Sequence, residues 1–205
     1  KNGAEKLLKD GFDAVFLAPG LWDAATIKPE GKDIEGLFSS VDYLSALRDG
    51  RFEEIEKKIK GKTVAVIGGG SVAMDCIESA ARLDAKDVYL IYRRSYSQMP
   101  AEPDERIEAQ EAGIHFMLLN QPTGYVTDKK NRLKGMKLIR TRLGEPDESG
   151  RRKPVEKSDS EWIMDADVVI EAICNKDPDD TPDWYHNVKV DRKKSIKADP
   201  ETGKT

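Results

Sequence analysis

A short glycine-rich segment contains the residues whose types and spacing point most clearly to chemistry. Gly68, Gly70 and Ala73 form the pattern GxGxxA. The pattern follows an apolar run at 63–67 and precedes an amphipathic run at 71–83, so it is expected to connect a strand to a helix. In such a turn the glycines permit a tight bend and let the backbone approach a pyrophosphate, while the helix N-terminus offers unpaired N–H groups. The pattern predicts a phosphate-binding turn, and the alternative is an ordinary flexible turn.

Two arginines, Arg93 and Arg94, follow the next predicted strand at 87–92. In a dinucleotide-binding βαβ unit, the end of the second strand meets the adenosine ribose about 20 residues after the glycines. An acidic residue there would accept a hydrogen bond from the ribose hydroxyl of NAD, whereas arginines bind a 2′-phosphate through charge-assisted, forked hydrogen bonds. The pair therefore favours NADPH, and the alternative is a solvated pair matched to nearby carboxylates.

The elements around these residues alternate between strands and helices, which is typical of a parallel sheet. Apolar runs predict strands at 63–67, 87–92, 114–119 and 167–173, and helical patterns lie at 71–83 and 104–112. Between the third and last of these strands the sequence changes to strands without helices, at 124–127, 133–143 and 161–164. The predicted fold is α/β: a Rossmann-like three-layer domain with a mainly parallel sheet flanked by helices and a small antiparallel β-meander.

Four further segments carry structural expectations. The apolar run 12–18 predicts a buried strand, and 40–47 predicts a short helix that Ser40 could cap. Residues 51–60 form a charged helix or linker. The polar insert 144–154 is hairpin-like, and the Glu- and Arg-rich stretch 145–157 is expected to be a solvated hairpin.

Composition excludes several classes of protein. The 205 residues include 34 Lys and Arg against 38 Asp and Glu, a net charge of −4, and no basic block suited to a nucleic-acid partner. No apolar run approaches the roughly 20 residues that span a bilayer, and no signal peptide is evident, so a cytoplasmic location is expected. Cys76 and Cys174 have no CxxC spacing and only two histidines as companions, so buried free thiols are expected rather than a metal site or disulfide framework.

Several segments together resemble the NADPH-binding domain of the glutamate synthase small (beta) subunit. The same domain type occurs in dihydropyrimidine dehydrogenase and related FAD-dependent pyridine nucleotide oxidoreductases. The segments, in order, are GKTVAVIGGGSVAMDC, VYLIYRRSYSQMPAEPDE, EAGIHF, RLGEPDESGRRKPV and DADVVIEAI. In that family the NADPH domain is inserted into an FAD domain, and hydride passes from NADPH to FAD. The resemblance also implies iron–sulfur clusters elsewhere in the parent, and a glutamate synthase large subunit or another electron-transfer protein as partner.

The resemblance assigns roles to individual residues. The pyrophosphate would be held by Gly68, Gly69, Gly70, Ser71, Val72 and Ala73. The 2′-phosphate would be held by Arg93 and Arg94, and the nicotinamide would lie near Ala172, Ile173 and Cys174. Cys174 stands where the family has Gly. This departure motivates an alternative function, a Rossmann-like scaffold or interaction domain that has lost nicotinamide binding.

The same resemblance divides the chain. Residues 1–60 would be a crossover segment and linker from the flavin domain, 61–174 the NADPH-binding domain, and 175–205 a return segment toward the FAD domain. FAD is expected in the parent protein and not in this piece alone. No side chain is assigned as a catalytic acid, base or nucleophile, because the cofactors carry the redox chemistry.

Overall fold

The computed structural model describes residues 3–18, 20–28, 33–147, 150–176, 188–192 and 195–205. The chain forms two compact units, one of residues 25–173 and one that combines 1–24 with 174–205. Each unit is described by itself. The expected return segment 175–205 lies partly outside the described residues.

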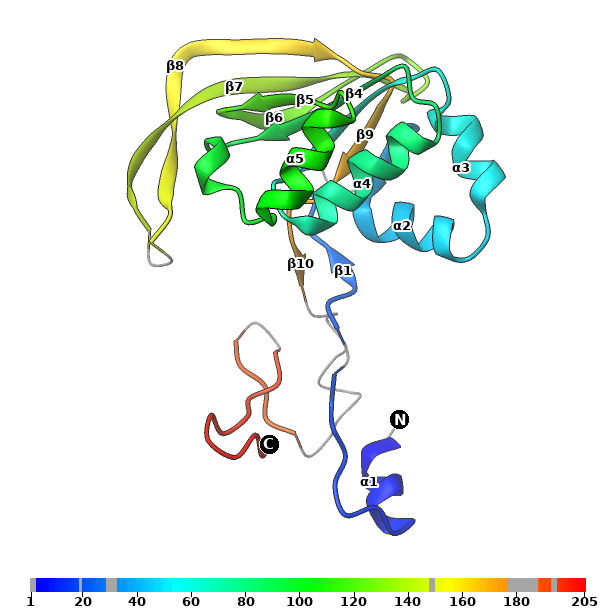
Figure 1. Ribbon diagram of the computed structural model, residues 1–205, viewed down its shortest axis with the longest axis vertical. Coiled ribbons are helices and arrows are strands. Elements are labelled where there is room, and N and C mark those ends of the chain that lie inside the picture. Colours follow the sequence, from blue (N-terminus) through cyan, green and yellow to red (C-terminus); the bar gives the residue numbers. More distant parts are fainter. Residues whose placement is uncertain (1–2, 19, 29–32, 148–149, 177–187, 193–194) are drawn as a thin grey trace. The chain divides into compact units, whose positions relative to one another are not determined.

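A five-stranded parallel sheet forms the centre of the unit 25–173 (Figure 1). Its strand order is β2-β9-β3-β4-β5, and every neighbouring pair is parallel. The strands are β2 (Leu37–Ser39), β3 (Thr63–Ile67), β4 (Asp87–Tyr92), β5 (His115–Leu118) and β9 (Val168–Glu171). The predicted parallel sheet is therefore confirmed.

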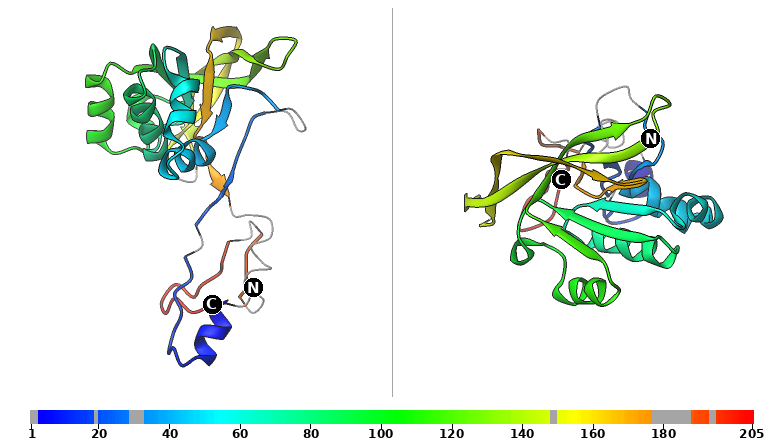
Figure 2. Two further views of the ribbon diagram at one scale, coloured as in Figure 1. Left: turned by 90° about the vertical axis from the view of Figure 1, so that its right-hand side faces the viewer. Right: turned by 90° about the horizontal axis from the view of Figure 1, so that it is seen from above.

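The helices pack on one face of this sheet, as Figure 2 shows. They are α2 (Ser40–Arg48), α3 (Phe52–Ile59), α4 (Ser71–Arg82) and α5 (Pro103–Glu111), with the short 3-10 helix η1 (Tyr96–Gln98) before α5. Side chains alternate along a strand, so Val64 and Val66 of β3 enter the same core as Tyr43 of α2 and Ile59 of α3. The helix expected at 40–47 is α2, and the stretch 51–60, expected as a helix or linker, forms α3. Both lie within the stretch 1–60 that the resemblance assigned to a crossover segment and linker, and both belong to the same core as α4.

An antiparallel sheet covers the opposite face of the parallel sheet. It consists of β6 (Asn120–Thr127), β7 (Leu133–Pro146) and β8 (Arg152–Asp165), in that order. Ala65 and Val169 face this second core, where they meet Met136, Leu138 and Met164. The predicted meander is confirmed. Because it covers the second face of the parallel sheet, helices α2 to α5 pack on the first face only.

The second unit contains short elements. Helix α1 (Gly3–Lys9) precedes the pair formed by β1 (Asp23–Ala24) and β10 (Asn175–Lys176), which are antiparallel. The expected buried strand at 12–18 was wrong: the segment is irregular, and the Phe16 side chain is 92% exposed. An apolar run becomes a strand only where a neighbouring strand pairs with it, and no strand of the described residues does so. Cys174 is also exposed, so the expectation that both thiols are buried holds for Cys76 alone.

The beginning of α2 differs by one residue from the prediction. Ser39, not Ser40, is the N-cap: its backbone is extended and its Oγ accepts a hydrogen bond from the Asp42 N–H at 3.0 Å. Ser40 is instead buried at the first helical position. No helix in the described part of the chain is long and apolar enough to cross a membrane.

The double-sided core predicts unequal effects for two isoleucines. Ile170 on β9 is fully buried, whereas Ile163 on β8 is 58% exposed. Ile170→Ala should lower the free energy of unfolding by about 2–5 kcal/mol, because it leaves a cavity in the helix-facing core. Ile163→Ala, the matched control, should change it by less than about 0.5 kcal/mol. Urea unfolding followed by circular dichroism measures both, and equal losses would contradict the assigned burial.

Candidate functional site

The glycine turn lies at the carboxyl edge of the parallel sheet, between β3 and α4. Gly68 has φ +153°, and a Cβ there would overlap the carbonyl oxygen of Ala172 and lie 3.1 Å from Cβ of Ala73. The Gly68 N–H donates to the Ile91 carbonyl at 3.1 Å, and the Ala172 N–H donates to the Ile67 carbonyl at 2.8 Å. The turn is thus fitted between the ends of two neighbouring strands, β4 and β9, and only glycine fits its first position.

The second and third glycines differ in what surrounds them. A Cβ on Gly69 would lie 2.5 Å from the Tyr92 ring, so the fold itself requires glycine there. A Cβ on Gly70 would meet nothing nearer than Pro100 Cγ at 3.6 Å, which is ordinary contact. Steric contacts within the protein therefore do not require glycine at position 70, and the backbone there is open to close approach by a ligand.

The N-terminus of α4 supplies the donors of the turn. Gly70 is the N-cap, and it has no side chain to satisfy the first N–H groups of the helix. The first turn of α4 contains no acidic residue, so its partial positive charge is not offset from within the helix. Ser71 Oγ donates to Glu105 Oε2 at 2.9 Å, and the same oxygen accepts the Glu102 N–H at 2.8 Å at the start of α5. This contact between α4 and α5 has no counterpart in the sequence prediction.

The segment that follows β4 closes over the turn. The Ala101 N–H donates to the Gly69 carbonyl at 3.0 Å, and the Tyr92 hydroxyl donates to the Gln98 carbonyl at 2.7 Å. The sequence patterns assign no structural role to residues 95–101 of this segment. Its function in the fold is to hold the turn and the end of β4 together.

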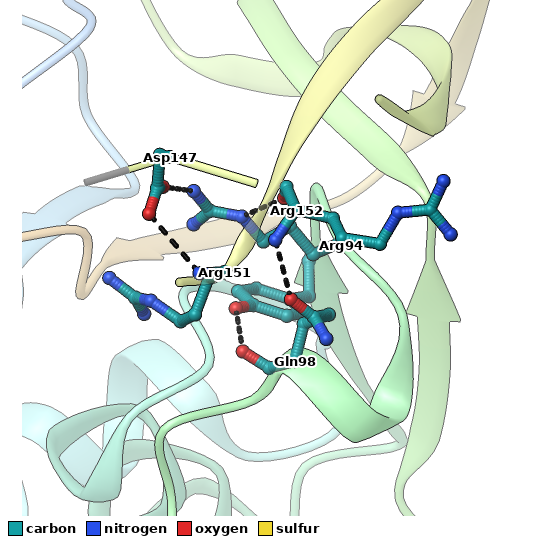
Figure 3. A network of polar contacts seen from close by, with 6 residues as sticks. Arg94, Gln98, Asp147, Arg151 and Arg152 are labelled. Atoms are coloured by element: carbon teal, nitrogen blue, oxygen red, sulfur yellow. Dashed lines mark hydrogen bonds and ion pairs between the residues drawn. The ribbon is translucent and has the colours of Figure 1, made fainter. Parts of the chain in front are cut away.

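The two arginines at the end of β4 have unlike surroundings, and Figure 3 shows those of Arg94. Arg93 is exposed, and its carbonyl accepts a hydrogen bond from Thr141 Oγ1 at 2.7 Å. Arg94 is buried: its Nε donates to the Arg152 carbonyl at 2.8 Å, and its Nη2 lies 2.7 Å from Asp147 Oδ2. The two guanidiniums that the sequence grouped together are thus available to a ligand to different degrees.

The partners of Arg94 come from the hairpin between β7 and β8. The sequence prediction of a hairpin at 144–154 is confirmed, but full solvation was wrong for part of it. The Arg152 N–H donates to Gln98 Oε1 at 2.8 Å, and Asp147 is half-buried against Arg94. A charged segment can dock in this way when its charges find partners of opposite sign.

The third predicted part of the site follows β9. Ala172 meets Gly68, as described above, and Ile173 is partly exposed at the end of the strand. Cys174 belongs to the second unit, where its Sγ donates to the Asn175 carbonyl at 3.3 Å. The structure therefore brings the glycine turn and Ala172 together, while Cys174 is described only within its own unit.

A buried carboxylate at the end of β9 was not anticipated. Glu171 is buried, and its Oε1 accepts hydrogen bonds from the Tyr125 hydroxyl and from the Ile27 N–H, the latter at 2.9 Å. Burial, and then the adjacent Glu171 carboxylate, raise the pKa of Tyr125 far above its usual value, so the phenol stays a donor. An acidic residue within the apolar run 167–173 is the sequence feature that could have revealed this site.

Two further observations concern the other ionisable groups that the structure describes. Burial raises the pKa of the Cys76 thiol to about 12, which keeps it protonated and unreactive. Among the described residues, no group of three or more His, Cys, Asp and Glu side chains is placed to hold a metal ion.

A parallel sheet with a glycine turn and a helix N-terminus at its carboxyl edge defines a Rossmann-like α/β fold, the class used by dinucleotide-dependent oxidoreductases. Solved structures agree on this fold. FprA from Mycobacterium tuberculosis, as a His57Gln mutant, matches with a TM-score of 0.68 at 17% identity, over 91% of this chain and 54% of that chain. FprA in complex with NADPH matches with a TM-score of 0.67 at 17% identity and the same coverage.

The chain belongs to the pyridine nucleotide-disulphide oxidoreductase family, whose sequence profile matches residues 2–203. The NADP(+)-dependent formate dehydrogenase subunit beta of Moorella thermoacetica is 40% identical over 195 residues, 95% of this chain and 27% of that protein. The glutamate synthase (NADPH) small chain of Halomonas elongata is 37% identical over 206 residues, 97% of this chain and 42% of that protein. The resemblance to glutamate synthase small subunits is confirmed, and the chain spans less than half the length of either relative.

The surroundings of the glycines predict which of them the fold needs. Gly68→Ala should lower the free energy of unfolding by about 2–4 kcal/mol, because of the positive φ and the overlap with Ala172. Gly70→Ala should cost about 1 kcal/mol or less, since its Cβ has room and the backbone is extended. Thermal and urea unfolding of the 205-residue chain compare the two variants. A larger loss for Gly70→Ala would refute this account of the turn.

The buried carboxylate gives a second stability prediction. Tyr125→Phe should lower the free energy of unfolding by about 1.5–3 kcal/mol, because it removes a donor from the buried Glu171. The control is Tyr89→Phe, on the same side of the parallel sheet, whose hydroxyl makes no hydrogen bond within the described residues. The control should stay within about 0.5 kcal/mol of the wild type. Similar values for the two variants would show that the Tyr125 hydrogen bond contributes nothing.

Proposed function

We propose that the unit 25–173 is the NADPH-binding part of a flavoprotein oxidoreductase of the glutamate synthase small subunit type. The observation that carries the proposal is the open space beside Gly70, where a Cβ would meet no protein atom nearer than 3.6 Å and where a pyrophosphate could approach the backbone. Exposed Arg93, at the end of the neighbouring strand, adds the charge that a 2′-phosphate requires. Both lie at the carboxyl edge of the sheet, where open α/β folds bind ligands.

The names of the relatives support NADPH as the cofactor. One is an NADP(+)-dependent formate dehydrogenase subunit, another is an NADPH glutamate synthase small chain, and a structural neighbour was solved with NADPH. We propose that the present chain binds NADPH as well. We also propose that the parent protein carries FAD, that residues 1–24 and 174–205 connect to its flavin domain, and that a large subunit or another electron-transfer protein is the partner.

In the proposed mechanism the chain binds and orients the cofactor. The N–H groups of Gly69, Gly70, Ser71 and Val72 would bind the pyrophosphate at the N-terminus of α4, and Ala73 keeps that helix close to β3. Arg93 would contact the 2′-phosphate, with Arg94 behind it. Ala172 and Ile173 would lie beside the nicotinamide, which supplies the hydride when bound. No side chain is required as a general acid or base.

A second candidate function is a scaffold or interaction domain that keeps the fold without binding nicotinamide. Cys174 favours it, because a side chain there replaces the glycine expected from the family resemblance. The two functions differ in a measurable way, since a scaffold would bind neither NADPH nor NADH.

The direct test is a titration of the 205-residue chain with NADPH and NADH by calorimetry. The wild type should bind NADPH more tightly than NADH. Arg93→Ala should weaken NADPH binding by about 1.5–3 kcal/mol and leave NADH unchanged, because only NADPH carries the 2′-phosphate. Arg142→Ala removes another exposed arginine, on β7, and is the matched control for lost positive charge.

Two results would count against the proposal. Absence of saturable binding of either cofactor at millimolar concentration would favour the scaffold. Equal losses of NADPH affinity in Arg93→Ala and Arg142→Ala would show that Arg93 does not bind the 2′-phosphate specifically.

A further inference from the structure

The ion pair between Arg94 and Asp147 occupies the place where the second phosphate-binding arginine was expected. The Arg94 side chain is 7% exposed and that of Asp147 23%. Nη2 of Arg94 lies 2.7 Å from Asp147 Oδ2, and its Nε donates to the Arg152 carbonyl at 2.8 Å. Figure 3 shows Arg94 with Asp147 and Arg152. The Arg94 guanidinium is thus already paired with the Asp147 carboxylate.

The position of the Asp147 carboxylate is fixed by its own hairpin. Asp147 Oδ1 accepts the Arg151 N–H at 3.2 Å, and the Asp147 N–H donates to the Arg151 carbonyl at 2.8 Å. The hairpin is in turn attached to the segment after β4, because the Arg152 N–H donates to Gln98 Oε1 at 2.8 Å. The carboxylate is therefore part of a connected network and not a mobile surface group.

Arg93 has no such counterion among the residues that the structure describes. Within the described residues its guanidinium makes no hydrogen bond or ion pair, and only its carbonyl is engaged, by Thr141 Oγ1 at 2.7 Å. A phosphate dianion approaching the end of β4 would meet a full positive charge at Arg93 and a neutralised pair at Arg94. The two neighbouring arginines are thus electrostatically unequal.

We propose that Asp147 is a specificity-determining residue: it acts as the internal counterion of Arg94, confines 2′-phosphate recognition to Arg93, and limits the affinity for NADPH. This inference rests on the proposed function, since it concerns the same cofactor site. It predicts that removal of the negative charge of Asp147 strengthens NADPH binding, although Asp147 would not itself contact NADPH.

The test is a set of variants titrated with NADPH, NADH and adenosine 2′,5′-bisphosphate, using the 205-residue chain. Asp147→Asn keeps an acceptor for Arg94 but removes the charge. It should tighten binding of NADPH and of the bisphosphate about 3- to 30-fold, the size expected for one unit charge several ångströms away, and leave NADH unchanged. Glu145→Gln is the matched control, because Glu145 is an exposed acid on the same hairpin. It should change NADPH affinity less than about 2-fold, since exposed charges are screened by salt.

A double variant keeps the test decisive even if Asp147→Asn folds poorly with a buried, uncompensated arginine. Arg94→Met alone leaves the Asp147 carboxylate facing the phosphate and should weaken NADPH binding. Arg94→Met with Asp147→Asn removes both charges and should return NADPH affinity to within about 3-fold of the wild type, because the pair is neutral toward the ligand.

The outcomes separate this inference from the proposed function. If the wild type binds NADPH but Asp147→Asn binds it equally or more weakly, the inference is overturned and the proposed function stands. The inference also fails if the double variant is as weak as Arg94→Met alone, since Arg94 would then contact the phosphate directly, or if Glu145→Gln tightens binding as much as Asp147→Asn. Failure of the wild type to bind any of the three ligands would overturn the proposed function itself.

Discussion

Strands β3 and β9 are neighbouring inner strands of the parallel sheet and are buried on both faces, and this burial constrains the rest of the unit 25–173. Val64 and Ile170 point toward the helices, while Ala65 and Val169 point toward the antiparallel sheet. Because a polar group within these strands would lose its hydration on either side, polar chemistry is confined to the positions where the strands end. The glycine turn, the arginines after β4 and the Glu171 carboxylate all lie at that edge.

At the edge, the backbone provides most of the proposed anion site. The net charge of the chain is −4, so its overall field does not attract a phosphorylated dinucleotide. The attraction has to be local: the N–H groups at the start of α4 and one exposed guanidinium, Arg93. The antiparallel sheet contributes as well, since Thr141 holds the carbonyl of Arg93 and the hairpin beyond it holds Arg94. The layer that covers the second face of the core thereby also positions the two arginines of the proposed cofactor site.

Sequence patterns predicted the features that depend on neighbours along the chain. Strand and helix periods indicated β3, α4 and β4, and the position of Arg93 followed from counting residues after the glycines. Contacts between distant residues were not predictable in this way. Arg94 and Asp147 are 53 positions apart, and Tyr125 and Glu171 are 46 apart, so no local pattern links them. The apolar run 12–18 failed for a related reason, because hydrophobicity shows a need for burial but does not identify the partner strand.

The central claim is that the glycine turn and Arg93 together bind one dinucleotide. A crystal structure of the chain with NADPH tests it most directly. The account predicts the pyrophosphate against Gly70 and the first turn of α4, with the 2′-phosphate on Arg93 and the Arg94–Asp147 pair intact. A cofactor bound away from Gly70, or a 2′-phosphate that displaces Asp147 from Arg94, would contradict it.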